Sequence, residues 1–318
     1  MFRNKKAIFI WIFAVCAVAA LALLATSFFD EELRVDDGSV DSGKIREEPF
    51  SVLILGKDEV SGLTDVMMLA SLDAENGRIC VMQIPRDTYA EYSDKHRKLN
   101  TASRVLGGER ELCDFLSDAL GVRIDGYVSL ELEGFRRAVD AIGGVEIELD
   151  RTLYYNDPEQ DLYIYLQKGK QHLDGKKAEM LIRYRSTYKR GDLDRLDMQK
   201  VFLRALFAKI KTSVNISNAY ELASSVFPYM DTNIPLTAFI SLGLKSLDVE
   251  DSGLVFLTLP GEDAKGGDGG SYYVMSKEPT RRVLEEYFVF TGEEIDGERL
   301  FEHPTNKDFQ KIYYAEAE

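Results

Sequence analysis

Residues 51–73 read SVLILGKDEVSGLTDVMMLASLD. Two short apolar runs, 51–56 and 66–72, are separated by a polar stretch that contains glycine. A third run, RICVMQIP at 78–85, follows the turn-rich residues DAENG at 73–77. Short apolar runs bounded by turn residues are typical of buried strands. We therefore expect three strands here, the second and third of which form a hairpin.

Strand and helix patterns alternate along the rest of the chain. Residues 131–142, for example, carry apolar side chains at helical spacing and end at a Gly-Gly pair, as helices commonly do. An alternation of this kind predicts an α/β sandwich around a mixed sheet. Helices are expected at 100–120 (broken at Gly107-Gly108), 131–142, 174–182, about 196–210 and 278–287, and extended segments at 122–130, 145–149 and 255–259.

Length and composition agree with one large domain and an appendage. The chain has 318 residues, of which 45% are hydrophobic and 29% charged, the balance of a globular protein with a core. Its net charge is −15, and residues 1–29 hold three basic residues and no acidic one, so the remainder carries −15 − 3 = −18. Such a body repels a phosphate backbone, which disfavours a DNA-binding regulator. Three cysteines are too few for a disulfide framework, and we expect Cys80 and Cys113 to be buried thiols rather than a bridge.

Residues 7–29, AIFIWIFAVCAVAALALLATSFF, are 23 residues without a charge, enough to cross a bilayer as a helix. Three basic residues precede this run and three acidic residues follow it, which places the N-terminus in the cytoplasm. A cleaved signal peptide is the alternative, although its apolar core usually has only about 7–15 residues. The prediction is a single-pass cell-membrane protein with a cytoplasmic N-terminus at 1–6, a transmembrane anchor at 7–29, an extracellular tether at 30–49 and an extracellular domain at 50–318.

Two loops that follow predicted strands carry polar residues suited to a ligand. Asp58 and Asp65 share the loop between the first two strands, and Mg2+ commonly binds one or two carboxylates together with phosphate oxygens and water. Arg86 leaves the third strand, and Lys98 and Asn100 come shortly after it. Taken singly, loop acids are usually solvated and such an arginine usually forms a surface ion pair.

A basic segment follows the helix expected at 174–182. If residues 183–185 are extended, Arg183 and Arg185 point to the same side, because side chains alternate along a strand. Paired guanidinium forks suit a diphosphate. Asp192, Arg195 and Gln199 come next, and an exposed basic helix end is the ordinary alternative.

Several motifs in order carry a resemblance. They are SVLILGKD with TDVMMLASLD, ICVMQIPRDTY, HRKLNTASRVLGG, IDGYVSLELEGFRRAVDAIGGVEIEL, LQKGKQHLDGKKAEMLIRYRS with GDLDRLDMQK, and LTLPG with GGSYYV. Together they resemble the LytR–CpsA–Psr (LCP) family of cell-wall glycopolymer transferases. The resemblance implies an α/β/α sandwich with a pocket for a polyprenyl diphosphate.

It also implies a Mg2+-dependent transferase outside the membrane. Such an enzyme moves a glycopolymer, of the teichoic acid or capsule kind, from undecaprenyl diphosphate to peptidoglycan. The residues that match the family's motifs are Asp58 and Asp65 as metal ligands, Arg86, Arg183, Arg185 and Arg195 as the diphosphate clamp, and Asp192, Lys98, Asn100 and Gln199 as supporting pocket residues. Asp192 is also our candidate for the general base, with His96 as the alternative.

Two positions depart from the family's pattern. Leu63 and Met198 stand where the family usually has arginine, and Lys57 or Lys189 could replace the lost charge. These departures keep a second interpretation open, in which the protein is a non-catalytic envelope scaffold or regulator that binds lipid-linked polymer or cell wall.

Overall fold

The computed structural model describes residues 49–57, 63–93, 97–158, 162–184, 192–214, 218–266, 268–291 and 309–311. Within these ranges no helix is both long and apolar enough to cross a membrane. The predicted anchor at 7–29 lies outside them, as does all of the predicted tether except Pro49.

A six-stranded sheet forms the centre, in the order β10-β3-β2-β1-β4-β9. The β1–β4 and β10–β3 pairs are parallel and the other pairs are antiparallel, so the sheet is mixed, as predicted. The expected hairpin is present as β2–β3. The bounds are β1 Phe50–Lys57, β2 Thr64–Asp73, β3 Arg78–Gln83, β4 Gly126–Leu130, β9 Met230–Thr232 and β10 Leu254–Thr258.

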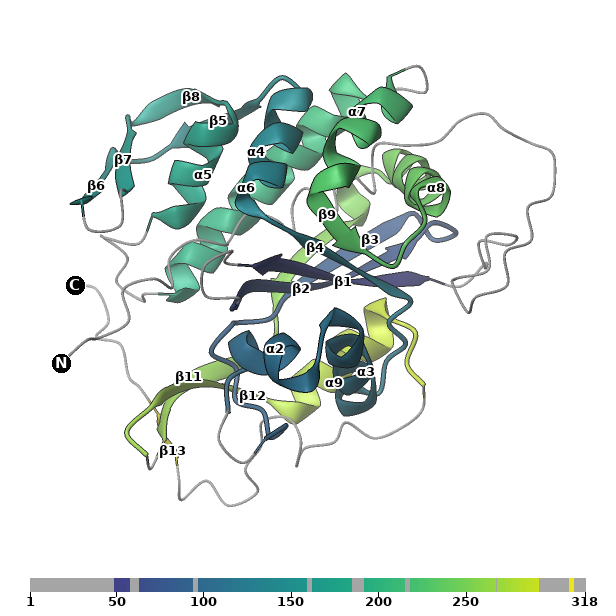
Figure 1. The fold of residues 1–318 in the computed structure, drawn as a ribbon, viewed down its shortest axis with the longest axis vertical. Helices are drawn as coiled ribbons and strands as arrows, with labels where there is room; N and C mark the ends of the chain where they lie inside the picture. Colours follow the sequence, from purple (N-terminus) through teal and green to yellow (C-terminus); the bar gives the residue numbers. More distant parts are fainter. Residues whose placement is uncertain are drawn as a thin grey trace.

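Both faces of the sheet are buried because apolar residues occupy successive positions of the strands. On β1, Val52 and Ile54 belong to one core cluster, and Leu53 and Leu55 belong to the other. Helices cover each face (Figure 1). The first cluster lies under α4 Leu132–Ala141, α5 Gly175–Arg183, α6 Asp192–Ser213, α7 Ala219–Val226 and α8 Leu236–Leu247, and the second under α2 Ala102–Leu106, α3 Glu109–Leu120 and α9 Lys277–Tyr287.

Local sequence signals explain several helix ends. The side chain of Asp174 accepts a hydrogen bond from the Lys177 N–H (2.8 Å) and so caps α5. Gly107 ends α2 with a φ of 115°, a left-handed conformation that favours glycine. Short 3-10 helices occur at η1 Leu99–Thr101, η3 Phe227–Tyr229 and η4 Asp251–Gly253.

The two cysteines of the domain are free and buried, which confirms the prediction of thiols rather than a bridge. Cys80 lies on β3 and Cys113 on α3, both in the second core cluster. Burial raises the pKa of each thiol to about 12. Neither thiol is therefore ionised near neutral pH.

The structure also has three small sheets that the sequence did not predict. One of their strands, β5, was expected at 145–149. These sheets pair β5 Val145–Leu149 with β8 Gly169–Leu173, β6 Leu153–Asp157 with β7 Leu162–Leu166, and β11 Gly261–Gly266 with β12 Ser271–Met275 and β13 Phe309–Lys311. In Figure 1 the β6–β7 and β11–β12 hairpins lie on the same side of the molecule, one above the central sheet and one below it.

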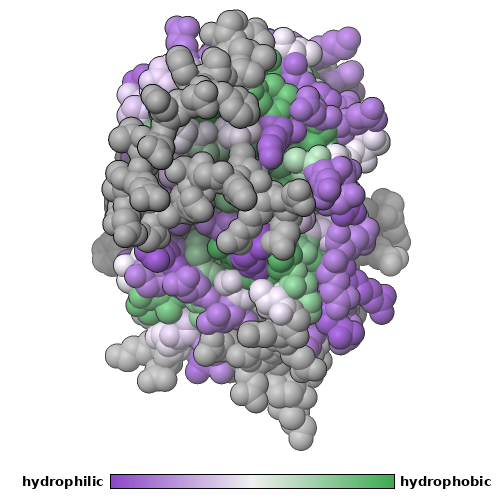
Figure 2. Space-filling model, turned by 90° about the vertical axis from the view of Figure 1, so that its right-hand side faces the viewer, coloured by the Kyte–Doolittle hydropathy of each residue, from purple (hydrophilic) through white to green (hydrophobic). Residues whose placement is uncertain are grey.

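The opposite end of the sheet, where β1 begins and β2 ends, holds a small cavity. Its lining is mostly apolar and includes Phe50, Val52, Leu72 and Ile79. The face on the right of Figure 1 is hydrophilic around smaller hydrophobic areas (Figure 2). The predicted site residues Asp65 and Arg86 lie at the other end, where β2 begins and β3 has ended.

Candidate functional site

The centre of the site is a tight turn that follows β3. The Thr88 N–H donates to the Pro85 carbonyl (3.0 Å), which places Arg86 and Asp87 at the corner. The Asn100 N–H donates to the Arg86 carbonyl (3.0 Å). On β12, the backbone carbonyl of Tyr273 accepts a hydrogen bond from the Tyr89 N–H (2.8 Å), and the Tyr273 N–H donates to the Asp87 carbonyl (2.9 Å). The backbone of the turn is therefore fixed on two sides.

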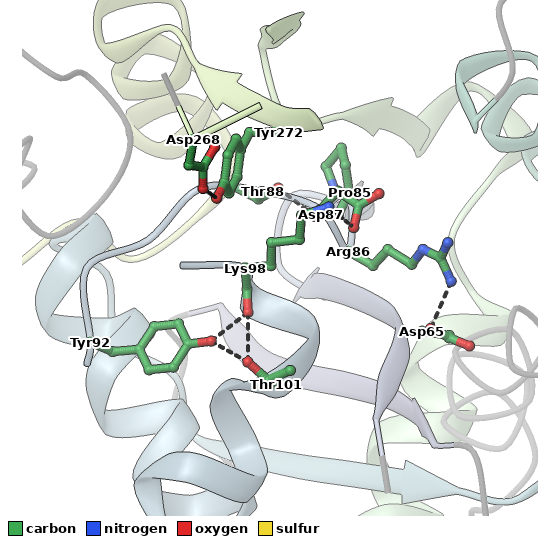
Figure 3. A network of polar contacts seen from close by, with 10 residues as sticks. All are labelled: Asp65, Pro85, Arg86, Asp87, Thr88, Tyr92, Lys98, Thr101, Asp268 and Tyr272. Carbon is green, nitrogen blue, oxygen red and sulfur yellow. Dashed lines mark hydrogen bonds and ion pairs between the residues drawn. The ribbon is translucent and has the colours of Figure 1, made fainter. Parts of the chain in front are cut away.

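Arg86 points from this turn to the start of β2. Its Nη1 lies 2.9 Å from Oδ1 of Asp65 (Figure 3). The Asp65 side chain is fully buried and that of Arg86 is 12% exposed. A charge so far from water is stable only when it is paired, so each group depends on the other.

Lys98 lies on the far side of the turn. Its Nζ is 3.0 Å from Oδ1 of Asp87 and 5.4 Å from the centre of the Tyr272 ring. The Tyr272 hydroxyl in turn donates to Oδ2 of Asp268 (2.6 Å), as Figure 3 shows. Burial, followed by this contact with Asp268, raises the pKa of Tyr272 to about 12. The β11–β12 hairpin thus helps to position the ammonium group beside the turn.

A pair of buried amides connects the end of β3 to α6. Nε2 of Gln83 donates to Oε1 of Gln199 (3.2 Å), and both side chains are 1% exposed. Within the described part of the chain, Oε1 of Gln83 and Nε2 of Gln199 have no hydrogen-bond partner. Each amide therefore keeps one buried polar atom that a ligand or water can satisfy. Five predicted residues lie in this neighbourhood: Asp65, Arg86, Lys98, Asn100 and Gln199.

Arg183 is placed differently from our expectation. It is the last residue of α5, and the extended backbone begins at Tyr184, so the argument from strand alternation, which needed 183–185 to be extended, was wrong for Arg183. Its Nη1 lies 2.6 Å from Oε1 of Glu179, and Nε of Arg136 lies 3.1 Å from Oε2 of the same carboxylate. The Arg183 side chain is only 4% exposed. A buried acid thus partly neutralises a residue that was predicted to bind phosphate.

Sequence reasoning missed three residues of this arrangement, namely Gln83, Glu179 and Tyr272. Glu179 could have been found if the helix expected at 174–182 had been extended by one residue, because Glu179 stands four residues before Arg183, the spacing of a helical ion pair. Gln83 is the one amide in the apolar run RICVMQIP, which was a usable signal. Tyr272 lies in the quoted motif GGSYYV, but that motif did not indicate a role for it, since its contact with Lys98 depends on the fold.

The remaining predicted residues are only partly described. Asp58, Arg185, Lys189 and the alternative base His96 lie outside the described residues. Asp192 and Arg195 lie on α6, which begins at Asp192, but their side chains are also outside the description. Lys57, considered as a replacement for an arginine at position 63, forms an ion pair with the buried Glu109. Burial lowers the Lys57 pKa, and Asp231 and Glu131 oppose that effect.

A comparison with known protein families shows to which family this chain belongs. A profile of the LytR_cpsA_psr family matches residues 27–288. The chain belongs to this family. The resemblance carried by the sequence motifs is therefore confirmed.

Individual relatives of the family agree. The chain is 27% identical over 267 residues to a Bacillus subtilis protein named polyisoprenyl-teichoic acid–peptidoglycan teichoic acid transferase TagV, covering 80% of this chain and 68% of the relative. It is 29% identical over 244 residues to TagU of Bacillus mycoides, which has the same transferase name, covering 75% and 78%. The crystal structure of B. subtilis TagV superposes with a TM-score of 0.64 at 26% identity, covering 76% of this chain and 98% of that one.

The family resemblance implies a Mg2+ ion, and one of its two predicted ligands, Asp65, is among the described residues. No group of three or more His, Cys, Asp and Glu side chains in the described ranges could hold a metal ion. Asp65 is one buried carboxylate beside the turn, and Mg2+ is often held by one or two carboxylates with phosphate and water supplying the rest. Asp65 alone therefore suits a metal ion that binds together with a phosphate ligand, and the second predicted ligand, Asp58, lies outside the described residues.

Proposed function

We propose that this chain is a transferase that moves a glycopolymer from a polyprenyl diphosphate to peptidoglycan on the outer side of the membrane. The observation that carries the proposal is the buried Asp65–Arg86 pair on a rigid turn. Its place in a chain that belongs to the LytR_cpsA_psr family gives the pair a phosphate-binding interpretation. The transferase names of TagV and TagU support the reaction class.

The chain's own residues suit phosphoryl transfer, which depends on positioning and charge neutralisation rather than on a covalent nucleophile. Arg86 presents a planar fork of N–H donors, which Asp65 holds through Nη1 while the Asn100 N–H fixes the backbone carbonyl of Arg86. Lys98 supplies a second cation across the turn. Asp65 and Asp58 would hold a Mg2+ ion, which when bound would neutralise the diphosphate and stabilise its departure.

The proposed location follows from the charge asymmetry around residues 7–29. With three basic residues before this segment and three acidic residues after it, the domain should lie outside the cell. Protease added to intact cells with a permeabilised wall should digest the protein from residue 30 onward. Protection of the domain would contradict this orientation.

An assay with the full-length chain tests the function directly. The chain would be incubated with Mg2+, a polyprenyl-diphosphate-linked glycopolymer and peptidoglycan, and the covalent product measured by mass spectrometry. Arg86→Lys should lose most of the transfer, because lysine keeps the charge but not the fork. Arg78→Lys, a change at the other end of the same strand, should not. If EDTA has no effect on transfer, the metal role is wrong.

One observation favours the second interpretation, a non-catalytic scaffold that binds lipid-linked polymer. Arg183 is partly neutralised by Glu179, and Leu63 stands where the family resemblance expects arginine, so the described residues offer less positive charge to a ligand than that resemblance implies. The same assay separates the two functions. If the chain binds the lipid-linked donor but forms no covalent product with peptidoglycan, the protein is a scaffold.

A further inference from the structure

The β6–β7 hairpin carries tyrosines on one side that no part of the proposed site uses. Side chains alternate along each strand, so Leu153, Ile164 and Leu166 pack into the core while their neighbours point outward. The outward residues are Tyr154, Asn156, Tyr163 and Tyr165, which we call the tyrosine face. Its three rings are 55%, 55% and 47% exposed, in chain order.

The rings of the tyrosine face form one group. Tyr154 is directly opposite Tyr165 on the neighbouring strand, and Asn156 is opposite Tyr163. The ring centres of Tyr154 and Tyr163 are 6.1 Å apart in an edge-to-face arrangement. The side-chain amide of Gln167 donates to the Tyr165 hydroxyl (3.3 Å). Cross-strand pairs stabilise a hairpin, but that role does not require three neighbouring rings to remain about half exposed.

Charge indicates what this surface can bind. None of the four residues of the tyrosine face is charged, in a chain in which 29% of residues are. The described flanks carry both signs, with Lys168 and the neighbouring Arg151 and Asp150 at one end and Asp157 at the other. An anionic polymer or an anionic lipid surface would find no cation on the face to attract it. The face matches an uncharged partner.

The side chains of the tyrosine face are suited to one class of uncharged partner, a sugar chain. A pyranose ring presents C–H groups on its flat sides and hydroxyl groups at its edge. Tyrosine rings offer an apolar surface with a polar hydroxyl at the rim, and Asn156 and Gln167 add amide donors and acceptors. The face has no exposed aliphatic side chain of the kind that inserts into lipid.

The position of the hairpin connects this surface to the proposed chemistry. β7 packs against α5, whose last residue is Arg183. In Figure 1 the hairpin lies on the side of the molecule where β11 and β12 lie, and β12 is bonded to the Arg86 turn. We propose that the tyrosine face binds the uncharged N-acetylhexosamine backbone of the acceptor glycan. The acceptor role rests on the proposed function, whereas the binding itself does not.

The test measures binding without any donor substrate. The full-length chain in lipid nanodiscs would be titrated calorimetrically with a short oligosaccharide of N-acetylglucosamine. Replacing Tyr154 and Tyr163 together by threonine, which keeps a strand-forming residue, should weaken binding by roughly tenfold, since two apolar stacking surfaces are lost. The matched Phe variants should stay within about threefold of wild type, because stacking is kept. Tyr220→Thr, which removes a 66% exposed tyrosine on α7, should leave the affinity unchanged.

A second measurement needs no variant. Bound oligosaccharide should protect Tyr154, Tyr163 and Tyr165 from iodination in the wild-type chain while Tyr220 still reacts. Absence of protection, or equal affinities of the Thr variant and wild type, would overturn the proposal. The proposal would also be overturned if the Thr variant kept its affinity for the glycan but no longer bound anionic vesicles or no longer self-associated. If the oligosaccharide protects these tyrosines from iodination but the chain transfers no glycopolymer to peptidoglycan, the proposed function is wrong and the glycan-binding role of the tyrosine face stands.

Discussion

Arg86 and Arg183 are both held by a carboxylate, but the two guanidinium groups are fixed by different parts of the fold. Arg86 lies on a turn whose backbone is bonded to η1 and β12, and its partner Asp65 comes from another strand. Arg183 pairs with Glu179 one turn earlier on its own helix. The conformation of the Arg86 turn therefore depends on assembly of the sheet and of the β11–β12 hairpin. The Arg183–Glu179 ion pair, by contrast, depends mainly on formation and burial of α5.

The difference bears on what each arginine can offer a ligand. Arg86 is oriented by tertiary structure and remains partly exposed, which suits a preorganised phosphate site. Arg183 is almost fully buried and shares its carboxylate with Arg136. Four predictions test this contrast.

The largest effect should come from breaking the buried pair that joins β2 to the turn. Arg86→Ala should lower the free energy of unfolding by about 3–5 kcal/mol, because it removes a partner from a buried carboxylate. Arg78→Ala is the matched control, since Arg78 pairs with Asp73 at the other end of the same hairpin but is 39% exposed. It should cost about 1 kcal/mol or less in urea unfolding. Equal losses would show that burial does not distinguish the two pairs.

The second prediction concerns the carboxylate between Arg136 and Arg183. Glu179→Gln should lower the free energy of unfolding by about 1–3 kcal/mol, since the carboxylate that pairs with both Arg183 and Arg136 becomes a neutral amide. It should also raise the affinity for a polyprenyl diphosphate, because Arg183 keeps its charge and the negative charge of Glu179 beside it is removed. Glu133→Gln removes the same charge from an exposed position on α4 and should change stability by less than about 0.5 kcal/mol. A fall in diphosphate affinity would instead make Glu179 the residue that orients Arg183 for the ligand.

The third prediction uses pH to examine the support of the Arg86 turn. The Tyr272 pKa is raised to about 12 by burial and then by Asp268, so the folded state keeps this proton when the unfolded chain has begun to lose it near pH 10. The unfolded state then binds fewer protons, and stability falls as the pH rises from 10 towards 12. Tyr272→Phe should make that decline less steep and lower stability at pH 8 by about 1 kcal/mol, because the hydrogen bond to Asp268 is lost. Thermal unfolding across this pH range measures both, and an unchanged slope would mean that Tyr272 does not titrate as described.

The smallest effect is expected at position 63. Leu63→Arg adds a cation beside the loop of Asp65 and should improve the affinity for inorganic diphosphate by up to about 1 kcal/mol, or about fivefold, as for other partly exposed charges. Leu63→Met is the control for size alone. Titration at low and high salt should show the gain only at low salt. No gain at low salt would indicate that the diphosphate lies away from this loop.

Most elements of the sheet could be predicted because their signal is local. The runs that became β1, β2 and β3 and the spacing that became α4 each indicate a structure without reference to the rest of the chain. The β6–β7 hairpin was missed because its outward residues are tyrosines, so its strands do not show a clear alternation of apolar and charged residues.

The candidate site was predictable in its residue types but not in its connections. Arg86 and Asp65 were nominated from strand ends, and the structure brings them together. The bond between Gln83 and Gln199 joins residues 116 positions apart, and nothing in either segment indicates it. Arg183 was misjudged because its conformation depends on where α5 ends, and helix ends are decided by packing as much as by sequence.

The hydrogen bonds between the Arg86 turn and Tyr273 also determine an order of assembly. β1, β2 and β3 are consecutive, and they can pair as soon as residues 50–83 are available. The two backbone bonds to Tyr273, by contrast, close a loop that includes most of the domain, and contacts of such high sequence separation form slowly. A chain that leaves the ribosome or crosses a membrane from its N-terminus would thus complete its sheet centre early and its Arg86 turn among the last. Truncation before Ser271 should leave a partly folded protein with no working site, so that this chain becomes competent to bind a phosphate ligand only once its C-terminal hairpin is in place.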